Sequence, residues 1–472
     1  LQFPNKTLLL AVCAACIGGT FQYGYNISII NSPTKPIQNF INETWLQRYN
    51  TYVSKEILTL LWSSIVSIFT LGGFIGASTG GALAIRYGRK GTLLVNNIFA
   101  LLASLLMGLS HPTGLFELLI AGRFLIGLNA GIGICVQPLY LGEIAPRCLR
   151  GAMAMGTSVF ITGGILTGQV IGLKELLGAE QYWPILLFLQ LIILPWFPES
   201  PRYLLIDRGN DLACNKALKR LHGSENYHDE REDIEKERLT ALGTQSKKPW
   251  ELFMDKNLRL QVITVILLNS AQQLNGINAI YFYASYVFTR AGIPDARIPY
   301  VTIGTGACEC LTALTCVREA SPWVPYLSMM CVFAFILSFG LGPAILNCIE
   351  IVSSVLLYSL LSGGVTNILT TEMFTQTARP AAYMIAGSVN WMSFFLIGMI
   401  FPFIVNGLQQ YCFLVFLVIC SLVALYIFFI VPETKNKTFL EIQEEFDSHS
   451  RIKLCKRESV ESNGDILLSP PL

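Results

Sequence analysis

The stretch "GEIAPRCLRGA" (residues 142–152) decides how this chain is organised, because "TEMFTQTARPAA" (371–382) repeats its pattern of charges. In both stretches a glutamate stands seven positions before an arginine. The motifs "PESPR" (198–202) and "PETK" (432–435) recur in the same order at nearly the same offset, about 230 residues. Two motifs that repeat together at one offset predict two half-molecules, which is the plan of a two-bundle transporter.

Apolar residues dominate the chain and come in long blocks. Hydrophobic residues make up 53% of the 472 and charged residues 14%, against roughly 25% in an average soluble domain. Blocks of about 20 apolar residues are long enough to cross a bilayer as helices. Examples are 8–30, 58–85, 92–109, 116–141, 152–173 and 413–431. The composition therefore predicts an all-α, multi-pass membrane protein whose surroundings are lipid.

Charge and cysteine usage exclude several classes of function. A net charge of +2 and only 4 histidines give no basis for a nucleic-acid partner or a histidine-rich metal site. The 13 cysteines mostly lie inside apolar blocks without metal-ligand spacing, where a thiol behaves as a small hydrophobe. No nucleophile–base pair stands in the expected spans, so an enzyme is the weakest hypothesis. We expect no metal, no cofactor and no obligatory protein partner.

Basic residues predict the orientation in the membrane. Lysine and arginine gather in "RYGRK" (86–90) and "PRCLR" (146–150), and the polar segment 207–256 is also rich in charge. Because basic connections stay on the cytoplasmic side, these segments and both termini are predicted to face the cytoplasm. Residues 31–56 then lie outside, and their sequon at Asn42 is the predicted glycosylation site.

Seven stretches together resemble the facilitative hexose transporters of the major facilitator superfamily. They are "FQYGYNISIINSP", "GRFLIGLNAGIG", "YLGEIAPRCLRGA", "PESPRYLL", "QQLNGINAIYFYA", "RPAAYMIAGSVNW" and "VPETKNKT". The resemblance covers nearly the whole chain and is closest to the branch that includes the fructose and urate carriers. It implies two six-helix bundles related by a pseudo-two-fold axis, and uniport of a hexose, fructose or glucose, across the plasma membrane by alternating access. It also implies that no cofactor is needed.

On this plan the chain divides into four parts. Residues 1–206 form the N-terminal bundle and 257–434 the C-terminal bundle, separated by a charged cytoplasmic linker with short helices at 207–256 and followed by a cytoplasmic tail at 435–472. The family pattern is altered in spans six and eight to ten. Residues 183–197 are only 15 long, about 22 Å of helix, where the family has a full sixth span.

Two interpretations of residues 301–374 stay open. In the first, 301–317 is a span, Arg318 is cytoplasmic and the rest supplies two further spans, which keeps twelve crossings. In the second, this stretch holds only half of the tenth span and the fold lacks a helix. The apolar segment 345–361 is predicted to lie in the membrane with Glu350 away from lipid. A non-transporting sugar sensor or an inactive variant is therefore an alternative function.

Four amides, Gln272, Gln273, Asn275 and Asn278, stand in an otherwise apolar stretch. A buried amide without a partner costs several kcal/mol in hydrocarbon, so these side chains are expected to face the bundle interior or a wet cavity. Amides both donate and accept hydrogen bonds, which suits sugar hydroxyls. The alternative is that they join helices to one another.

The resemblance implies a set of sugar contacts. They are Tyr23, Gln169, Gln272, Gln273, Asn275, Asn278, Tyr281, Asn390 and Trp391. The family's serine after "QQL" is Asn275 here, the asparagine of its eighth span is Glu309, and the tryptophan of the glucose carriers' tenth span is Asn367. These departures leave the choice among fructose, glucose and urate open.

The resemblance also bears on coupling and gating. Proton-driven relatives carry an aspartate where this chain has Asn26, and an asparagine cannot titrate, so passive transport is favoured. Glu309 keeps proton coupling as an alternative, because a carboxylate inside a membrane is a functional candidate. The cytoplasmic charges that resemble the family's inner gate are Arg86, Arg89, Glu143, Arg147, Arg150, Glu199, Arg202, Glu372, Arg379 and Glu433.

Overall fold

The computed structural model describes most of the first half of the chain and parts of the second. The described residues are 6–30, 33–146, 150–178, 182–188, 198–222, 227–241, 248–255, 258–274, 294, 297–317, 369–370, 373–375, 377–408 and four short pieces between 418 and 430. Within them every regular element is a helix. The all-α prediction is therefore confirmed for the described part of the chain.

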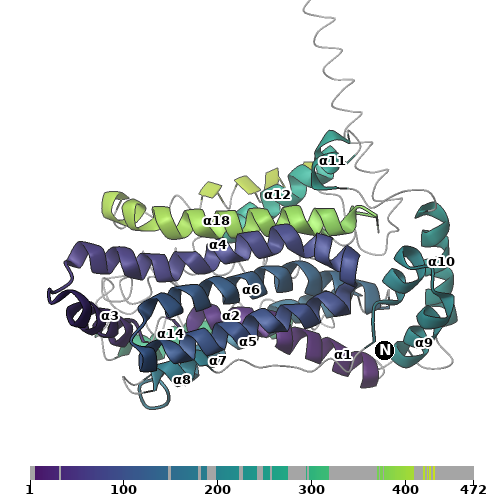
Figure 1. The fold of residues 1–472 in the computed structure, drawn as a ribbon. Helices are drawn as coiled ribbons and strands as arrows, with labels where there is room; N and C mark the ends of the chain where they lie inside the picture. The colour runs from purple at the N-terminus through teal and green to yellow at the C-terminus, as the bar shows by residue number, and fades with distance from the viewer. Residues whose placement is uncertain are drawn as a thin grey trace, which may run out of the picture.

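Long apolar helices lie side by side and form the body of the molecule (Figure 1). Within the described residues, five stretches are long and apolar enough to cross a membrane: Lys6–Ser28, Glu56–Tyr87, Arg89–Thr113, Phe116–Ile144 and Arg379–Ile397. The first stretch contains α1 (Lys6–Cys16), a short π-helix η1 (Ile17–Phe21) and α2 (Gln22–Ser28). The next three belong to α4 (Lys55–Tyr87), α5 (Arg89–Thr113) and α6 (Phe116–Ile144).

Glycines let α4 approach two neighbours at once. A Cβ on Gly72 would stand 2.3 Å from the carbonyl oxygen of Phe124 in α6. The adjacent Gly73 faces α18 (Arg379–Leu408) instead, where a Cβ would stand 2.3 Å from the ring of Trp391. Small residues are the usual means of close packing between membrane helices. The sequence "TLGGFIGASTGGALA" is therefore built to join α4 to both α6 and α18.

Among the described helices, the N-terminal half meets the C-terminal half mainly through two helix pairs, and α6 also contacts α18. One is α4 with α18, where the hydroxyls of Ser78 and Ser388 lie 2.9 Å apart. The other is α7 (Arg150–Ile171) with α14 (Ile298–Val317). The helix α12 (Arg259–Leu274) packs against α18 within the C-terminal half. These pairs line the contact between the two halves with α4, α7, α14 and α18.

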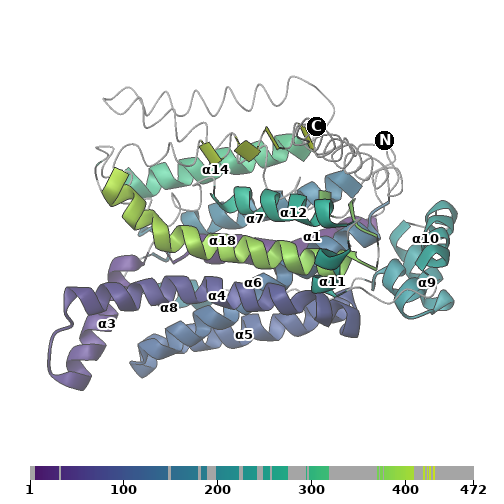
Figure 2. The same ribbon diagram turned by 90° about the horizontal axis from the view of Figure 1, so that it is seen from above.

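Short helices lie at the two ends of the bundle (Figures 1 and 2). At one end is α3 (Thr34–Tyr49); at the other are η3 (Tyr203–Asp207), α9 (Asp211–His222), α10 (His228–Ala241) and α11 (Pro249–Met254). Leu205, Cys214, Leu218 and Ile234 form a small apolar core that joins η3, α9 and α10. The charged segment 207–256 thus contains helices with a core of their own.

The altered regions of the sequence are only partly described. The helix α8 (Trp183–Phe188) covers the first residues of the shortened sixth span, and α14 covers 298–317. Residues 189–197 and 318–368, with Glu350 and Asn367, lie outside the described residues. The two interpretations of 301–374 therefore both stay predictions.

Candidate functional site

An aromatic cluster lies where the two halves meet. The ring of Trp391 in α18 contacts the edge of Tyr23 in α2, with 5.5 Å between ring centroids, and that of Phe69 in α4 at 5.4 Å. Trp391 is fully buried and Tyr23 nearly so. Two of the predicted sugar contacts, from opposite halves of the chain, are thus in direct contact with each other.

The amides of the C-terminal half are also brought together. At the end of α12, the Nε2 of Gln273 donates a hydrogen bond to the Oδ1 of Asn390 in α18, at 2.5 Å. Gln272 and Gln273 are both buried, and Asn390 is 9% exposed. The other predicted members, Asn275, Asn278 and Tyr281, lie outside the described residues.

The predicted contact Gln169 lies on α7, at the junction with α14. A Cβ on Gly306 of α14 would stand 2.2 Å from the Oε1 of Gln169, so the absence of a side chain there makes room for the amide. Glu309 follows Gly306 by one helical turn and is buried on α14. Residues three apart share a helix face, so both lie toward the same side of α14.

Ser158 is a polar residue of this region that the sequence interpretation missed. It precedes Gln169 by eleven residues on α7, which is three turns of helix, so the two side chains lie on one face. Ser158 is buried, and its hydroxyl has no hydrogen-bond partner among the described residues. The signal in the sequence was the spacing Ser158, Thr162 and Gln169, which is a polar stripe on an otherwise apolar helix.

Buried polar atoms that lack partners within the described part of the chain include Ser158 Oγ and Gln169 Oε1 on α7 and Trp391 Nε1 on α18. Buried polar atoms are nearly always hydrogen-bonded, so such atoms call for an explanation. Ser158 lies three helical turns from Gln169, about 16 Å along α7, so one hexose cannot reach both. The acceptor of Gln169 and the donor of Trp391 are of the kinds that sugar hydroxyls can satisfy.

Arg123 is a second residue that the sequence interpretation missed. It is fully buried in α6, where its guanidinium donates to the backbone carbonyl oxygen of Asn26 at 3.0 Å and lies 4.5 Å above the ring of Phe69. A charged residue inside a membrane span is by default a functional candidate. The signal was the arginine in "AGRFLIGL", within an apolar block.

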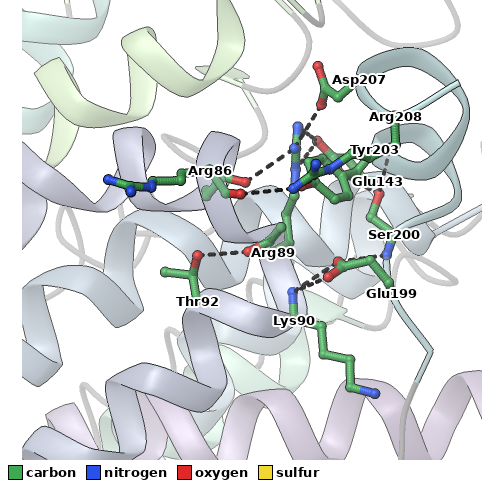
Figure 3. Close-up of polar contacts among 12 residues, drawn as sticks. Arg86, Arg89, Lys90, Thr92, Glu143, Glu199, Ser200, Tyr203, Asp207 and Arg208 are labelled. Atoms are coloured by element: carbon green, nitrogen blue, oxygen red, sulfur yellow. Dashed lines mark hydrogen bonds and ion pairs between the residues drawn. The ribbon is translucent and has the colours of Figure 1, made fainter.

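A charged network occupies the end of the bundle that carries α9 and α10 (Figure 3). At the start of α5, Arg89 donates from Nε and one terminal nitrogen to the Oε1 of Glu143, at 3.1 and 2.9 Å. Its other terminal nitrogen donates to the Oδ2 of Asp207 at 2.9 Å. Arg89 and Glu143 are both buried. Burial raises the pKa of the Asp207 carboxyl above its usual value, and the Arg89 guanidinium opposes this rise.

The same network ties η3 to the turn between α4 and α5. The carboxylate of Glu199 accepts the backbone N–H of Lys90 at 2.9 Å. Arg208 donates to the backbone carbonyl oxygen of Arg86 at 3.0 Å and to the hydroxyl of Tyr203 at 2.8 Å. Figure 3 shows the side chain of Arg86 pointing away from these groups, so it contributes its peptide oxygen and not its charge.

The other predicted charges are placed as follows. Arg202 and Arg379 are buried, and Arg379 donates to the backbone carbonyl oxygen of Phe374 at 3.1 Å. Arg150 begins α7 but its side chain is not described, and Arg147, Glu372 and Glu433 lie outside the described residues.

The predicted glycosylation site, Asn42, lies partly exposed on α3. Among the described residues, no group of three or more His, Cys, Asp or Glu is placed to hold a metal ion.

The geometry of a two-half helical bundle with a polar centre agrees with comparisons to known proteins. The profile of the family described as "Sugar (and other) transporter" matches residues 11–446. The chain belongs to the sugar transporter family. It is therefore a multi-pass membrane transporter with an all-α major facilitator fold and not an enzyme.

Individual members of the sugar transporter family are similar along almost the whole chain. The human protein named "Solute carrier family 2, facilitated glucose transporter member 11" is 46% identical over 480 residues, which cover 93% of each chain. The mouse facilitated glucose transporter member 5 is 41% identical over 484 residues, which cover 94% of this chain and 93% of the relative. The proton:xylose symporter XylE, solved with 6-bromo-6-deoxy-D-glucose, matches with a TM-score of 0.77 at 19% identity, over 94% of this chain and all of its own. That last likeness establishes the fold.

Proposed function

We propose that this protein is a hexose uniporter of the plasma membrane, working by alternating access with both termini in the cytoplasm. Its substrate is a sugar of the glucose or fructose class. The observation that carries the proposal is the hydrogen bond from the Arg123 guanidinium to the backbone carbonyl oxygen of Asn26. A proton-coupled carrier would need a titratable group at this position instead. The facilitated glucose transporters to which the chain is 41–46% identical support the sugar class.

The absence of coupling follows from the chemistry of Asn26. Driving a sugar against its gradient requires a group that binds a proton on one side and releases it on the other. The amide of Asn26 cannot do so, and within the described residues no carboxylate contacts Arg123. Arg123 is thus a fixed structural cation, and transport is passive.

The proposed sugar site surrounds the aromatic cluster between the halves. The amides of Gln273 and Asn390 and the unpartnered atoms of Gln169 and Trp391 supply donors and acceptors. The remaining proposed contacts are Tyr23, Gln272, Asn275, Asn278 and Tyr281. Because residues from α2, α7, α12 and α18 take part, a bound sugar touches both halves at once. That is the condition for coupling sugar binding to a rocking motion of the halves.

The charged network of Arg89, Glu143 and Glu199 is the proposed inner gate of the N-terminal half. The remaining proposed gate residues are Arg86, Arg147, Arg150, Arg202, Glu372, Arg379 and Glu433. Such pairs favour the state in which they are formed and are lost when that side opens. They bias the equilibrium between the two states without touching the sugar.

Counterflow in proteoliposomes tests the proposal. The purified full chain, preloaded with unlabelled glucose or fructose, is expected to accumulate the labelled sugar transiently. Competition by urate would favour the alternative of a urate carrier. No counterflow with either sugar would favour the sensor or inactive alternative. Uptake that exceeds equilibrium only under a proton gradient would instead favour coupling through Glu309, which is buried on α14.

A further inference from the structure

The first membrane helix is interrupted by a π-turn. In η1, "IGGTF" (17–21), backbone hydrogen bonds reach five residues back instead of four. The turn contains one residue more than a regular α-helix would, so the chain beyond it is rotated by about 100° about the helix axis. Tyr23 follows this turn on α2. The direction in which the Tyr23 side chain points from the helix axis therefore depends on whether the π-turn is present.

One side chain of α6 holds the π-turn in place. The Oε1 of Gln137 accepts the backbone N–H of Thr20 at 2.8 Å. Its Nε2 donates to the hydroxyl of Thr20 at 3.0 Å and to the sulfur of Cys16 at 3.2 Å. Gln137 is 0% exposed. Both ends of the amide are thus used, and all three bonds go to the residues at the π-turn or directly before it.

The surroundings of Gln137 are shaped for this contact. A Cβ on Gly19 would stand 2.2 Å from the Oε1 of Gln137, so a glycine is needed where the amide reaches the turn. The next residue, Pro138, lies inside α6 and lacks the N–H that would continue the helical ladder. Both helices are therefore irregular at the same level, and a polar contact inside the membrane is energetically favourable there.

We propose that Gln137 is a positioning residue of the transport cycle, which clamps the π-turn and so holds Tyr23 of α2 against Trp391 of α18. The contact between Tyr23 and Trp391 joins the two halves, with 5.5 Å between their ring centroids. Without the clamp, the N–H of Thr20 loses its acceptor, the π-turn opens more often, and Tyr23 leaves this contact while the turn is open. The inference rests on the proposed hexose transport for its kinetic readout.

A second pair of buried amides, Asn96 and Asn129, joins two helices without a π-turn. Asn96 of α5 donates to the backbone carbonyl oxygen of Asn129 in α6, and Asn129 donates back to that of Asn96, each at 2.9 Å. Neither residue lies at a π-turn. Asn129 therefore provides a matched control on the same helix: it also bonds to the backbone of a neighbour but does not set a rotation.

Hydrogen exchange of the full chain in nanodiscs tests the clamp without any transport. In Gln137→Met, which keeps the side-chain size but loses the acceptor, exchange of the peptide covering residues 16–23 is expected to accelerate about tenfold or more. Gly19→Ala, which displaces the amide, is expected to do the same, so a variant that fails to fold leaves the other to decide. Asn129→Ala is expected to leave this peptide unchanged. Equal exchange in wild type and both clamp variants would overturn the proposal.

A double-variant experiment tests the link to Tyr23. Gln137→Met and Tyr23→Ala are each expected to raise the KM for sugar, and the double variant is expected to be no worse than Tyr23→Ala alone. If the fold-increase in KM of the double variant equalled the product of the two single-variant increases, Gln137 would act independently of Tyr23, and the positioning role would be overturned. If the wild-type chain carries no hexose, the proposed function fails, whereas the exchange experiment still decides whether the clamp exists.

Discussion

The guanidinium of Arg123 donates to the backbone carbonyl oxygen of Asn26, with 3.0 Å between nitrogen and oxygen. The side-chain amide of Asn26 turns to its own helix and donates to the carbonyl oxygen of Gln22 at 2.8 Å. A fully buried cation is thus stabilised by a peptide dipole and by the face of the Phe69 ring. This arrangement makes position 26 the most direct place to introduce a titratable group.

Asn26→Asp is expected to make transport depend on pH. A carboxylate cannot donate to the Gln22 carbonyl oxygen as the Asn26 amide does, so we expect the new side chain to turn toward Arg123, which already contacts the backbone oxygen of residue 26. Protonation of the carboxylate then changes the charge of the buried pair. We expect the uptake rate of the variant to change about threefold or more between about pH 5.5 and about pH 7.5. Wild type and the neutral variant Asn26→Ser should change less. A proteoliposome assay at several pH values measures this, and a pH-independent Asn26→Asp protein would contradict the fixed-cation role of Arg123.

Gln169→Ala and Gln273→Ala are each expected to weaken sugar binding while surface expression stays normal. In the proposed site each amide makes one or two hydrogen bonds with sugar hydroxyls, worth about 0.5–1.5 kcal/mol apiece, so the KM should rise roughly two- to tenfold. Competition by unlabelled sugar at equilibrium exchange is the measurement. Unchanged affinity in both variants would mean that these amides only join helices.

Gly73→Ala is expected to slow transport, whereas Gly163→Ala is expected to have little effect. A Cβ at Gly73 would meet the Trp391 ring at 2.3 Å and push α4 away from α18, but a Cβ at Gly163 meets nothing within 4 Å. Both substitutions favour helix formation equally, so the comparison isolates the contact between halves. Maximal uptake rates normalised to surface protein give the answer. Equal rates in the two variants would show that the close contact is unimportant for cycling.

Arg89→Ala is expected to destabilise the protein much more than Arg238→Ala. Removing Arg89 breaks its buried ion pair with Glu143, and breaking a buried pair from one side typically costs about 3–5 kcal/mol. Arg238 of α10 is partly exposed and pairs with Asp211 and Glu235 at 3.7 and 3.6 Å, and such surface pairs contribute at most about 1 kcal/mol. The measurement is the midpoint of thermal unfolding of the Arg89→Ala and Arg238→Ala variants in detergent. Similar midpoints for both variants would show that the buried network is not stabilising.

Cys214 is expected to resist alkylation in the folded protein. It is buried in the small core of η3, α9 and α10, and this burial raises the pKa of its thiol to about 11. The thiolate is the reactive form, and a rise of about two units lowers its fraction about a hundredfold at neutral pH. Ile234→Ala, which opens the core, should increase labelling. Mass spectrometry of maleimide-treated protein measures it, with unfolded protein as reference, and rapid labelling of folded wild type would contradict the buried placement.

Much of the fold could be predicted from the sequence because membrane helices are encoded locally. Each block of apolar residues needs only its own length and composition to specify a span, as for 92–109 within α5. The family motifs added the site residues, and the structure brings Gln273 and Asn390 together as hydrogen-bonded neighbours. Motifs of this kind identify candidate site residues because members of a family share them.

The π-turn, Gln137 and Arg123 were missed because their roles depend on contacts between helices. The π-turn at 17–21 cannot be read from the sequence, because residues 8–16 before it are apolar on every face and periodicity is read from the contrast between faces. Gln137 lies 117 residues from Thr20 in sequence, and the spacing within one helix says nothing about rotation relative to another. Arg123 bonds to a backbone oxygen, which every residue carries, so no partner can be recognised from residue types.

The attachment of the short helices determines how motion of the two halves can be observed. Arg89 and Arg208 fasten η3, and with it α9 and α10, to α4 and α5 of the N-terminal half. The buried Leu252 fastens α11 to the core that α12 and α18 share. A spin label or fluorophore on α9 therefore reports the position of one half, and a second on α11 reports the other. The distance between two such labels gives a spectroscopic reaction coordinate for the cycle, recorded on surface helices without placing a probe in the sugar path.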